Sequence, residues 1–197
     1  MKRKLILASA SPRRRELMGY FPIPIEVVVP EVDESVTLGL GPAPFARLLA
    51  ERKALAVVKR KSDKDPVLAA DTIVIVDDEI LGKPYDAEDA ARMLKLLSGR
   101  THQVITGVAI LWKGKEVLFA VSTDVSFKEL TPKEIADYIA TGEPMDKAGA
   151  YAIQGTGGFM VTEITGSASN VIGLPVAETI AALQNLGFLE GLAPTGS

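Results

Sequence analysis

The sequence contains no cysteine and a single histidine, His102, among its 197 residues. Without cysteine the chain can form no disulfide, no thiolate metal site and no cysteine nucleophile, and it fits an intracellular protein. One histidine excludes a histidine cluster, and the serine motif G-x-S-x-G is absent as well. These absences argue against hydrolases that depend on a Ser/His/Asp triad or on a cysteine nucleophile.

Long apolar runs and an excess of positive charge are also missing. No run approaches the ~18 residues of a membrane span. The apolar stretch from Leu5 to Ala8 is too short for the roughly 7–15 residues of a signal-peptide core. The formal net charge of −3 leaves no overall basic field for nucleic acid or anionic membrane. We therefore expect a cytoplasmic protein that binds neither, and any anion site must come from a local cluster of residues.

Strand and helix signals alternate along the chain, with hairpins between them, which predicts an α/β class with a mixed sheet. The expected strands cover residues 4–8, 26–29, 67–76, 102–112 and 115–127, with a short partner strand ending in LGKP at 81–84. The expected helices cover residues 12–19, 44–61, 86–97, 131–142 and 175–186. On the helix over 44–61, the apolar face is expected to carry Phe45, Leu48, Leu49, Leu55 and Ala56. Residues 146–170 are glycine-rich and expected to be irregular. One domain over 1–190 is predicted, with a loose tail over 191–197.

The stretch SASPRRREL at 9–17 combines hydroxyls and cations at a helix start. Ser11, followed by proline, is a favourable helix cap, and helix amino termini suit phosphate. Ser9 and Ser11 add hydroxyl donors, and Arg13 in the first turn can lean back towards them. Helical geometry turns Arg14 and Arg15 away from Arg13, so we expect them to point elsewhere. A solvated basic face with a capping serine remains the alternative interpretation.

Two acids are candidates for chemistry. Asp71 lies inside the apolar stretch AADTIVIV, where an unpaired carboxylate would be costly, which indicates a ligand, a base or a partner of a cation. Glu34 lies in the loop PEVDES, where an acid is ordinarily just solvated. For Glu34 the residues alone leave solvation and function open.

Two lysines and a glutamine complete the set of candidates. Lys53 lies at the edge of the apolar face of its helix, where a snorkelling lysine is the default explanation. Lys83 occupies the turn LGKP, which is not a P-loop because the glycine spacing differs and no Ser/Thr follows. Gln154, in the glycine-rich GAYAIQGTGG, could read a base edge through its amide or simply belong to a turn. Cations, hydroxyls and acids together indicate metal-assisted hydrolysis or binding of a phosphate ester.

Several of these stretches together resemble the Maf family of nucleoside triphosphate pyrophosphatases. The matching pieces are SASPRRREL at 9–17, VDE at 32–34, AADTIV at 69–74, LGKP at 81–84, TGEPMDKAGAYAIQG at 141–155 and NVIGLP at 170–175. They occur in family order and span nearly the whole chain. SPRR, DTIV and DKAGAYAIQG resemble the branch that acts on dTTP and UTP. The branch that acts on 7-methyl-GTP carries SPYR and a DQ pair, which this chain lacks.

The resemblance implies hydrolysis of a nucleoside triphosphate, dTTP or UTP with modified pyrimidine triphosphates as further candidates, to the monophosphate and pyrophosphate. It implies a divalent cation, Mg²⁺ or Mn²⁺. It also implies a two-lobed α/β fold around an elongated mixed sheet flanked by helices, similar to inosine triphosphate pyrophosphatases, with the cleft between the lobes. Family members commonly form dimers, so a homodimer is among the expected states.

The resemblance also assigns roles to individual residues. Asp71 resembles the general base and a metal ligand, and Glu34 resembles the second acid at the metal. Thr72, Gln154 and Arg13 match the positions that set substrate specificity, while Lys53 and Lys83 match lysines around the phosphates. Ser9 and Ser11 would face phosphate. Two alternatives remain: a nucleotide-binding regulator of septum formation and cell division that acts through partners, and a purine-directed house-cleaning enzyme.

Overall fold

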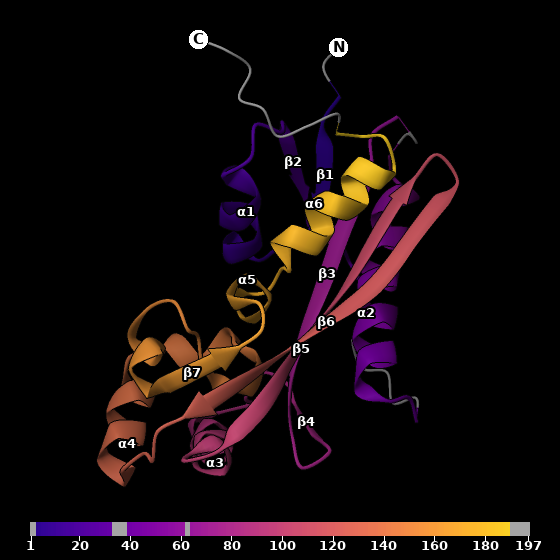
Figure 1. Ribbon diagram of the computed structural model, residues 1–197. Coiled ribbons are helices and arrows are strands. Elements are labelled where there is room, and N and C mark those ends of the chain that lie inside the picture. Colours follow the sequence, from indigo (N-terminus) through magenta and orange to yellow (C-terminus); the bar gives the residue numbers. More distant parts are fainter. Residues whose placement is uncertain (1–2, 33–38, 62–63, 190–197) are drawn as a thin grey trace. The chain divides into compact units, whose positions relative to one another are not determined.

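The computed structural model describes residues 3–32, 39–61 and 64–189. In this part of the chain a seven-stranded sheet has the order β2-β1-β3-β5-β6-β7, with β4 paired to β3. The strands are β1 (Leu5–Ala8), β2 (Ile25–Val28), β3 (Val67–Val76), β4 (Glu79–Leu81), β5 (Thr101–Trp112), β6 (Lys115–Phe127) and β7 (Val161–Thr165). The helices are α1 (Pro12–Gly19), α2 (Pro42–Val58), α3 (Ala87–Leu97), α4 (Pro132–Ala140), α5 (Ala168–Ile172) and α6 (Val176–Asn185). Figure 1 shows these elements in chain order.

The sheet is mixed, as the sequence predicts. β1 is parallel to both β2 and β3, whereas β4 is antiparallel to β3 and β7 is antiparallel to β6. Both predicted hairpin turns are present: Lys113 and Gly114 have φ of 50° and 72°, and Asp77 and Asp78 have φ of 48° and 65°. Two-residue hairpin turns with positive φ at both positions match the twist of the flanking strands. The predicted α/β class with helices flanking a mixed sheet is confirmed.

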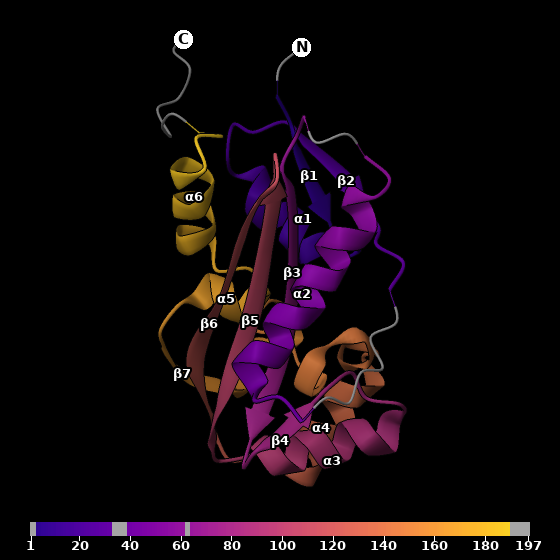
Figure 2. The ribbon, with the colours of Figure 1, turned by 90° about the vertical axis from the view of Figure 1, so that its right-hand side faces the viewer.

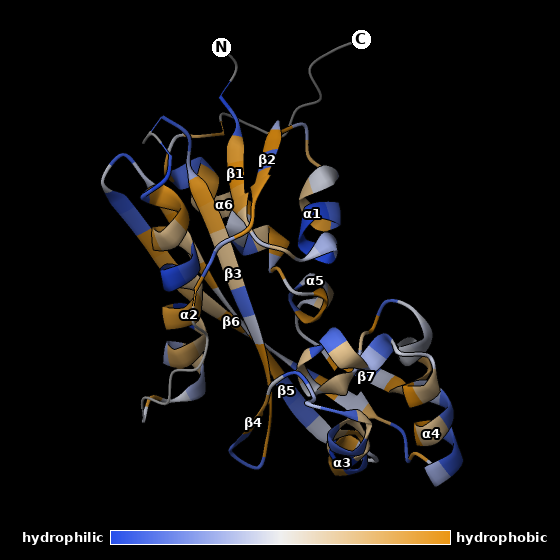
Figure 3. Cartoon of the chain, turned by 180° about the vertical axis from the view of Figure 1, so that it is seen from behind, coloured by the Kyte–Doolittle hydropathy of each residue, from blue (hydrophilic) through white to orange (hydrophobic). Residues whose placement is uncertain are grey.

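The chain forms two compact units, each built from separate segments. The first unit contains the described residues up to Asp71, Thr106–Val121 and those from Gly173 onward, and the second contains Thr72–Ile105 and Ser122–Ile172. In the first unit, α2 and α6 lie on opposite sides of the strands (Figure 2). β1 and β2 are largely hydrophobic, whereas α1 carries hydrophilic residues (Figure 3).

Helix α2 packs on the sheet through a different face from the one predicted. Its buried residues are Ala46, Leu49, Ala50, Lys53, Ala54 and Val57. Of the five residues predicted for this face only Leu49 is buried, and Leu55 is 40% exposed. The cause lies in β5, where a Cβ added to Gly107 would be 2.3 Å from the backbone of Ala46. Because helix and strand backbones meet this closely, three alanines (Ala46, Ala50 and Ala54) belong to the buried face, whereas Phe45, Leu48 and Leu55 are only partly buried or exposed.

The second unit has its own core beneath α3 and α4. Both predicted helix starts are confirmed: Asp86 accepts a hydrogen bond from the amide of Asp89 at 2.8 Å, and Thr131 and Glu134 form a capping box. Helices α3 and α4 lie against each other. The core of this unit contains Val74, Leu94, Leu97, Val104, Phe127, Tyr138, Tyr151 and Met160.

The glycine-rich segment over 146–170 is more ordered than predicted. It contains the 3₁₀ helices η2 (Ala148–Ala150) and η3 (Thr156–Met160), following η1 (Glu143–Asp146), and then strand β7 and helix α5. The prediction of irregular structure was wrong for β7, because the alternation in VTEIT stands beside glycines that obscure a strand signal. The predicted tail over 191–197 lies outside the described residues. No helix in the described ranges is long and apolar enough to cross a membrane.

Candidate functional site

The carboxyl end of β1 lies beside the middle of β3 in the first unit. Ala8, the last residue of β1, is the register partner of Ala69. Ser9 therefore leaves the sheet at the level where β3 continues towards Asp71. Ligands of open α/β sheets bind outside the carboxyl ends of parallel strands. Ser9 and Asp71 therefore lie near the same level of the sheet, close to the carboxyl end of β1.

The turn after β1 begins α1 as the sequence predicts. The Oγ of Ser9 accepts a hydrogen bond from the amide of Ser11 at 3.1 Å. The Oγ of Ser11 in turn accepts one from the amide of Arg14 at 3.5 Å, and Ser11 is the residue that caps the helix. Arg13 is partly buried in the first turn. The helix amino terminus is therefore formed at the carboxyl end of β1, where its amides and dipole favour an anion.

The three arginines of α1 have different environments. The Nε of Arg14 donates to the carbonyl of Gly173 at 2.7 Å, and its Nη1 lies 3.5 Å from the Oγ of Ser9. The prediction that Arg14 points away from the serines was therefore wrong. A backbone carbonyl far along the chain, which no local pattern reveals, determines its direction. Arg15 is exposed, as expected for a residue that faces away from a ligand.

A buried ion pair joins Asp71 to Lys53. The Nζ of Lys53 donates to Oδ1 of Asp71 at 2.5 Å, and each residue is 8% exposed. The interpretation of Lys53 as a snorkelling lysine at the edge of the helix was wrong, because it belongs to the buried face of α2. The close approach of α2 to the sheet carries the ammonium to the carboxylate. Mutual attraction offsets part of the cost of taking both charges out of water.

In the second unit, the turn with Lys83 and the segment leading to Gln154 are joined through the backbone. The amide of Gly149 donates to the carbonyl of Gly82 at 3.0 Å. Lys83 and Gln154 are both exposed. Two side chains predicted to contact substrate therefore stand on neighbouring segments of the second unit.

Thr72 belongs to the same region of the second unit. A Cβ added to Gly149 would lie 2.9 Å from the side chain of Val74, so this segment packs directly on β3. Thr72 and Val74 point to the same face of β3, because side chains alternate along a strand. Thr72 is half-buried there. The structure thus groups Ser9, Ser11, Lys53 and Asp71 in the first unit, and Thr72 with the segments of Lys83 and Gln154 in the second.

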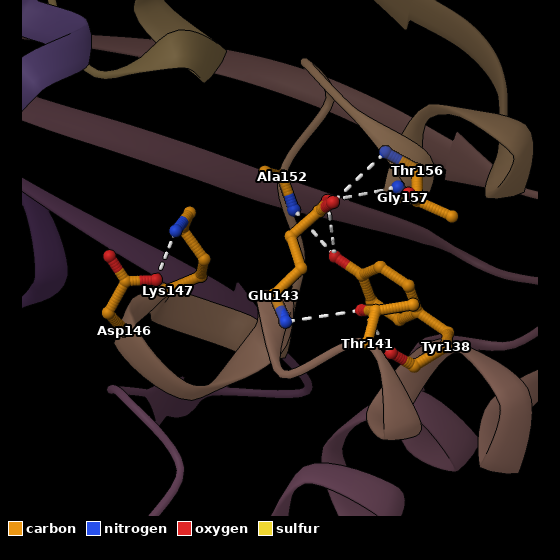
Figure 4. Close-up of polar contacts among 8 residues, drawn as sticks. All are labelled: Tyr138, Thr141, Glu143, Asp146, Lys147, Ala152, Thr156 and Gly157. Atoms are coloured by element: carbon orange, nitrogen blue, oxygen red, sulfur yellow. Dashed lines mark hydrogen bonds and ion pairs between the residues drawn. The ribbon is translucent and has the colours of Figure 1, made fainter.

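Sequence reasoning missed Glu143, which lies within the quoted stretch TGEPMDKAGAYAIQG. Its carboxylate accepts hydrogen bonds from the Tyr138 hydroxyl at 3.0 Å and from the amides of Thr156 and Gly157 at 3.0 and 3.1 Å (Figure 4). Burial acts to raise the pKa of Glu143, but the bonds from Gly157, Thr156 and Tyr138 outweigh it and lower the pKa. The sequence has no distinctive signal for Glu143, because an acid between a helix-ending glycine and a glycine-rich loop is ordinarily solvated.

His102 is a buried neutral residue close to this stretch. It is 2% exposed, and its Nε2 lies 2.8 Å from the hydroxyl of Tyr151. Its ring makes edge contacts with Tyr151 and Phe127. Burial lowers the pKa of His102 to about 4, against a smaller opposing effect of Asp124. His102 therefore belongs to the core of the second unit.

The donor chemistry for a divalent metal rests on Asp71. Across residues 3–32, 39–61 and 64–189, no group of three or more His, Asp or Glu side chains could hold a metal ion. Glu34, the second predicted ligand, lies outside the described residues. Mg²⁺ is commonly held by one or two carboxylates together with substrate phosphates and water. The Asp71 carboxylate, bonded to Lys53 through Oδ1, fits such a site through its other oxygen.

A family model described as Maf-like protein matches residues 4–186. The chain belongs to the Maf family. A protein from Anaeromyxobacter dehalogenans named dTTP/UTP pyrophosphatase is 50% identical over 95% of this chain and 96% of its own length. Proteins with the same name from Bacillus cytotoxicus and Bacillus velezensis are 50% and 47% identical, over 92% and 95% of this chain and 95% and 99% of their own lengths. The resemblance predicted from the motifs is confirmed.

Among solved structures, a nucleoside-triphosphatase / dITP/XTP pyrophosphatase from Mycobacterium abscessus aligns with 71% of this chain and 94% of its own. The TM-score is 0.41 and the sequence identity is 19%. This likeness is too weak to bear on either fold or function.

Proposed function

We propose that this protein hydrolyses nucleoside triphosphates, dTTP and UTP foremost, to the monophosphate and pyrophosphate. The observation that carries the proposal is the buried Lys53–Asp71 pair beside the carboxyl end of β1. Membership of the Maf family, and relatives at about half identity that bear the name dTTP/UTP pyrophosphatase, support the same activity. Modified pyrimidine triphosphates are further candidate substrates, and a role in cleaning the nucleotide pool follows.

In this proposal Asp71 acts as the general base. A water molecule attacks the α-phosphorus, its proton passes to the carboxylate of Asp71, and the bond to the bridging oxygen breaks to release pyrophosphate. Lys53 orients the carboxylate through its bond to Oδ1 and lies where it can offset charge on the phosphates. Mg²⁺ or Mn²⁺, held by Asp71 and Glu34, would lower the pKa of a bound water molecule and neutralise charge on the phosphates.

Substrate recognition is assigned to the residues that match the phosphate and specificity positions of the family. Ser9, Ser11 and Arg13 at the start of α1 offer hydroxyls, amides and a cation to phosphate oxygens, and Lys83 adds a further cation. Arg13, Thr72 and Gln154 are proposed to set specificity. The Gln154 amide can donate to O4 and accept from N3–H of thymine or uracil, which is one complementary pair of hydrogen bonds.

A panel of nucleotides tests this proposal. Pyrophosphate release is measured from dTTP, UTP, dCTP, dATP, dGTP and 7-methyl-GTP with Mg²⁺ and with Mn²⁺. We expect the highest kcat/KM for dTTP and UTP, with nucleoside monophosphate as the other product. Equal activity on 7-methyl-GTP would contradict the assigned branch. No release from any nucleotide would reject the enzyme and leave a nucleotide-binding regulator of cell division.

Cytoplasmic location and a homodimer remain predictions from the sequence. Sedimentation of the purified protein at several concentrations tests the second of these.

A further inference from the structure

Two side chains, Tyr138 and Glu143, accept hydrogen bonds from the loop that carries Gln154, one before and one after that residue. The amide of Ala152, before Gln154, donates to the hydroxyl of Tyr138 at 3.3 Å. The amides of Thr156 and Gly157, after Gln154, donate to the carboxylate of Glu143. Tyr138 and Glu143 are themselves joined, as Figure 4 shows. The three residues between these anchor points are therefore tied at both ends to one hydrogen-bonded pair.

The fit between this pair and the loop is close. A Cβ added to Gly155 would lie 2.9 Å from Oε2 of Glu143, and one added to Gly157 would lie 2.6 Å from the Tyr138 hydroxyl. Gly155 also has a φ of 100°, which side-chain-bearing residues rarely adopt. Because both positions are glycine, the loop backbone can approach the oxygens of Glu143 and Tyr138 closely.

The contrast between the buried anchoring groups and the exposed Gln154 indicates a positioning role for Glu143. Tyr138 is 1% exposed, whereas Gln154 is exposed. The Glu143 carboxylate accepts from a hydroxyl and two amides, so its capacity to accept hydrogen bonds is largely used inside the protein. We propose that Glu143 is a positioning residue that fixes the loop of Gln154 and thereby sets the selectivity between thymine or uracil and cytosine.

This inference rests on the proposed function, in which Gln154 reads the base. Thymine and uracil present an acceptor at position 4 and a donor at position 3, whereas cytosine presents a donor and an acceptor. A glutamine amide can match either pattern by rotating about its last bond. Discrimination therefore needs a fixed amide, since a mismatched base then leaves polar groups unpaired. In this inference, the bonds from the loop amides to Glu143 keep the Gln154 amide in one orientation.

The test compares kcat/KM for dTTP and dCTP in the wild type and in Glu143→Gln. The substitution keeps the shape of the side chain but removes its charge and one accepting oxygen. We expect the dTTP:dCTP ratio to fall at least about fivefold, which corresponds to roughly 1 kcal/mol of lost discrimination. A loss of folded protein lowers both rates equally and leaves the ratio unchanged. Tyr138→Phe is expected to lower the ratio less, because it removes the anchor before Gln154 and one bond to Glu143 but leaves the bonds from the amides of Thr156 and Gly157 in place.

Glu134→Gln serves as the matched control. Glu134 lies in α4 of the same unit, bonds to Thr131 in the capping box and pairs with Lys128. Its substitution removes the same charge and comparable hydrogen bonds without touching the loop. We expect its dTTP:dCTP ratio to equal that of the wild type. A fall as large as that of Glu143→Gln would overturn the proposal.

Amide exchange in the protein without nucleotide gives a readout independent of catalysis. Glu143→Gln should speed hydrogen exchange at Thr156 and Gly157 about tenfold, and Glu134→Gln should not. Faster exchange with an unchanged dTTP:dCTP ratio would overturn the inference, as would a wild-type ratio near one.

If the wild type hydrolyses neither nucleotide, the proposed function fails, and the same ratio is taken from dissociation constants for dTTP and dCTP. A binding ratio that Glu143→Gln leaves unchanged, or the absence of binding, would then overturn the inference by itself.

Discussion

Two carboxylates, one in each unit, are held in opposite ways, and Asp71 is buried whereas Glu143 is half-buried. Oδ1 of Asp71 accepts a hydrogen bond from the ammonium of a single long side chain, Lys53. Glu143 accepts from a tyrosine hydroxyl and two backbone amides, all of them neutral. Backbone amides cannot leave without moving the loop, so Glu143 is suited to holding structure. A lysine side chain can exchange its partner for a phosphate oxygen, so Asp71 is suited to chemistry.

The largest effect should come from Asp71→Asn. The amide cannot take a proton from water, so we expect kcat for dTTP to fall by about 10²–10⁴-fold. The dissociation constant for dTTP should change by only a few-fold, because the substitution keeps the size of the side chain. Single-turnover pyrophosphate release and calorimetric titration measure the two quantities.

Asp77→Asn is the control for this prediction. Asp77 follows the same strand, β3, and forms an exposed pair with Arg100. Its substitution should leave kcat unchanged. Turnover of Asp71→Asn at the wild-type rate would remove Asp71 from the role of base.

Lys53→Met tests the buried pair by removing the lysine, which leaves Asp71 buried without its cation. Removing one partner of a buried pair costs about 3–5 kcal/mol of unfolding free energy. Denaturant unfolding should show this loss, and should show a loss at least about 2 kcal/mol smaller when the substitution is made in an Asp71→Asn background. The cycle remains informative even where the single variant is only marginally folded.

Lys61→Met provides the matched measurement at the surface. Lys61 pairs with Glu26 on the first unit, and both side chains are substantially exposed. Because water screens such pairs, we expect a loss of no more than about 1 kcal/mol. Equal losses for Lys53→Met and Lys61→Met would show that the Lys53–Asp71 pair is not desolvated in solution.

A smaller effect, on the pH dependence of stability, should come from His102 in the second unit. Its pKa of about 4 in the folded protein lies below the value of about 6.5 expected after unfolding. The unfolded chain therefore binds more protons between these values. The contribution of His102 is complete above pH 6.5 or so and is lost as the pH falls towards about 4.

This predicts that the unfolding free energy of the wild type is about 1 kcal/mol lower at about pH 5.5 than at about pH 7.5. Denaturant unfolding of the wild type and of His102→Gln at both pH values measures the difference. The decrease should be absent in His102→Gln. An equal decrease in both proteins would assign it to other groups.

Most elements of the fold could be predicted from the sequence, because their signals are local. Ser11 before proline, the Thr131–Glu134 capping box and the Lys113-Gly114 turn each lie within a few residues of the structure that they specify. Strand β3 was predicted with its observed bounds because its β-branched run is continuous. Local chemistry alone was sufficient for these elements.

The errors concern contacts between residues far apart in the chain. The buried face of α2 depends on Gly107, about fifty residues beyond the end of the helix, whose missing side chain lets the helix backbone approach the strand at Ala46. Lys53 lies on this buried face and meets Asp71, which is 18 residues away in the chain. Arg14 turns to the carbonyl of Gly173. No periodicity in the sequence encodes these partners.

The candidate site shows the same contrast between local signals and contacts between distant residues. Asp71 could be singled out because a carboxylate in an apolar strand is costly whatever surrounds it. Glu143 could not, because an acid near glycines has no unusual local environment. Its amide partners, Thr156 and Gly157, lie 13 and 14 residues away in the chain. Its importance depends entirely on how that loop folds back.

The most direct test of the contrast between the two carboxylates is a parallel measurement of Asp71→Asn and Glu143→Gln. Single-turnover rates are recorded for dTTP and dCTP under the same conditions. Asp71→Asn should lose turnover on both nucleotides by a similar factor and keep the wild-type dTTP:dCTP ratio. Glu143→Gln should retain turnover on dCTP and have a lower dTTP:dCTP ratio than the wild type. The reverse pattern, or the same pattern in both variants, would contradict the assignment of chemistry to Asp71 and of positioning to Glu143.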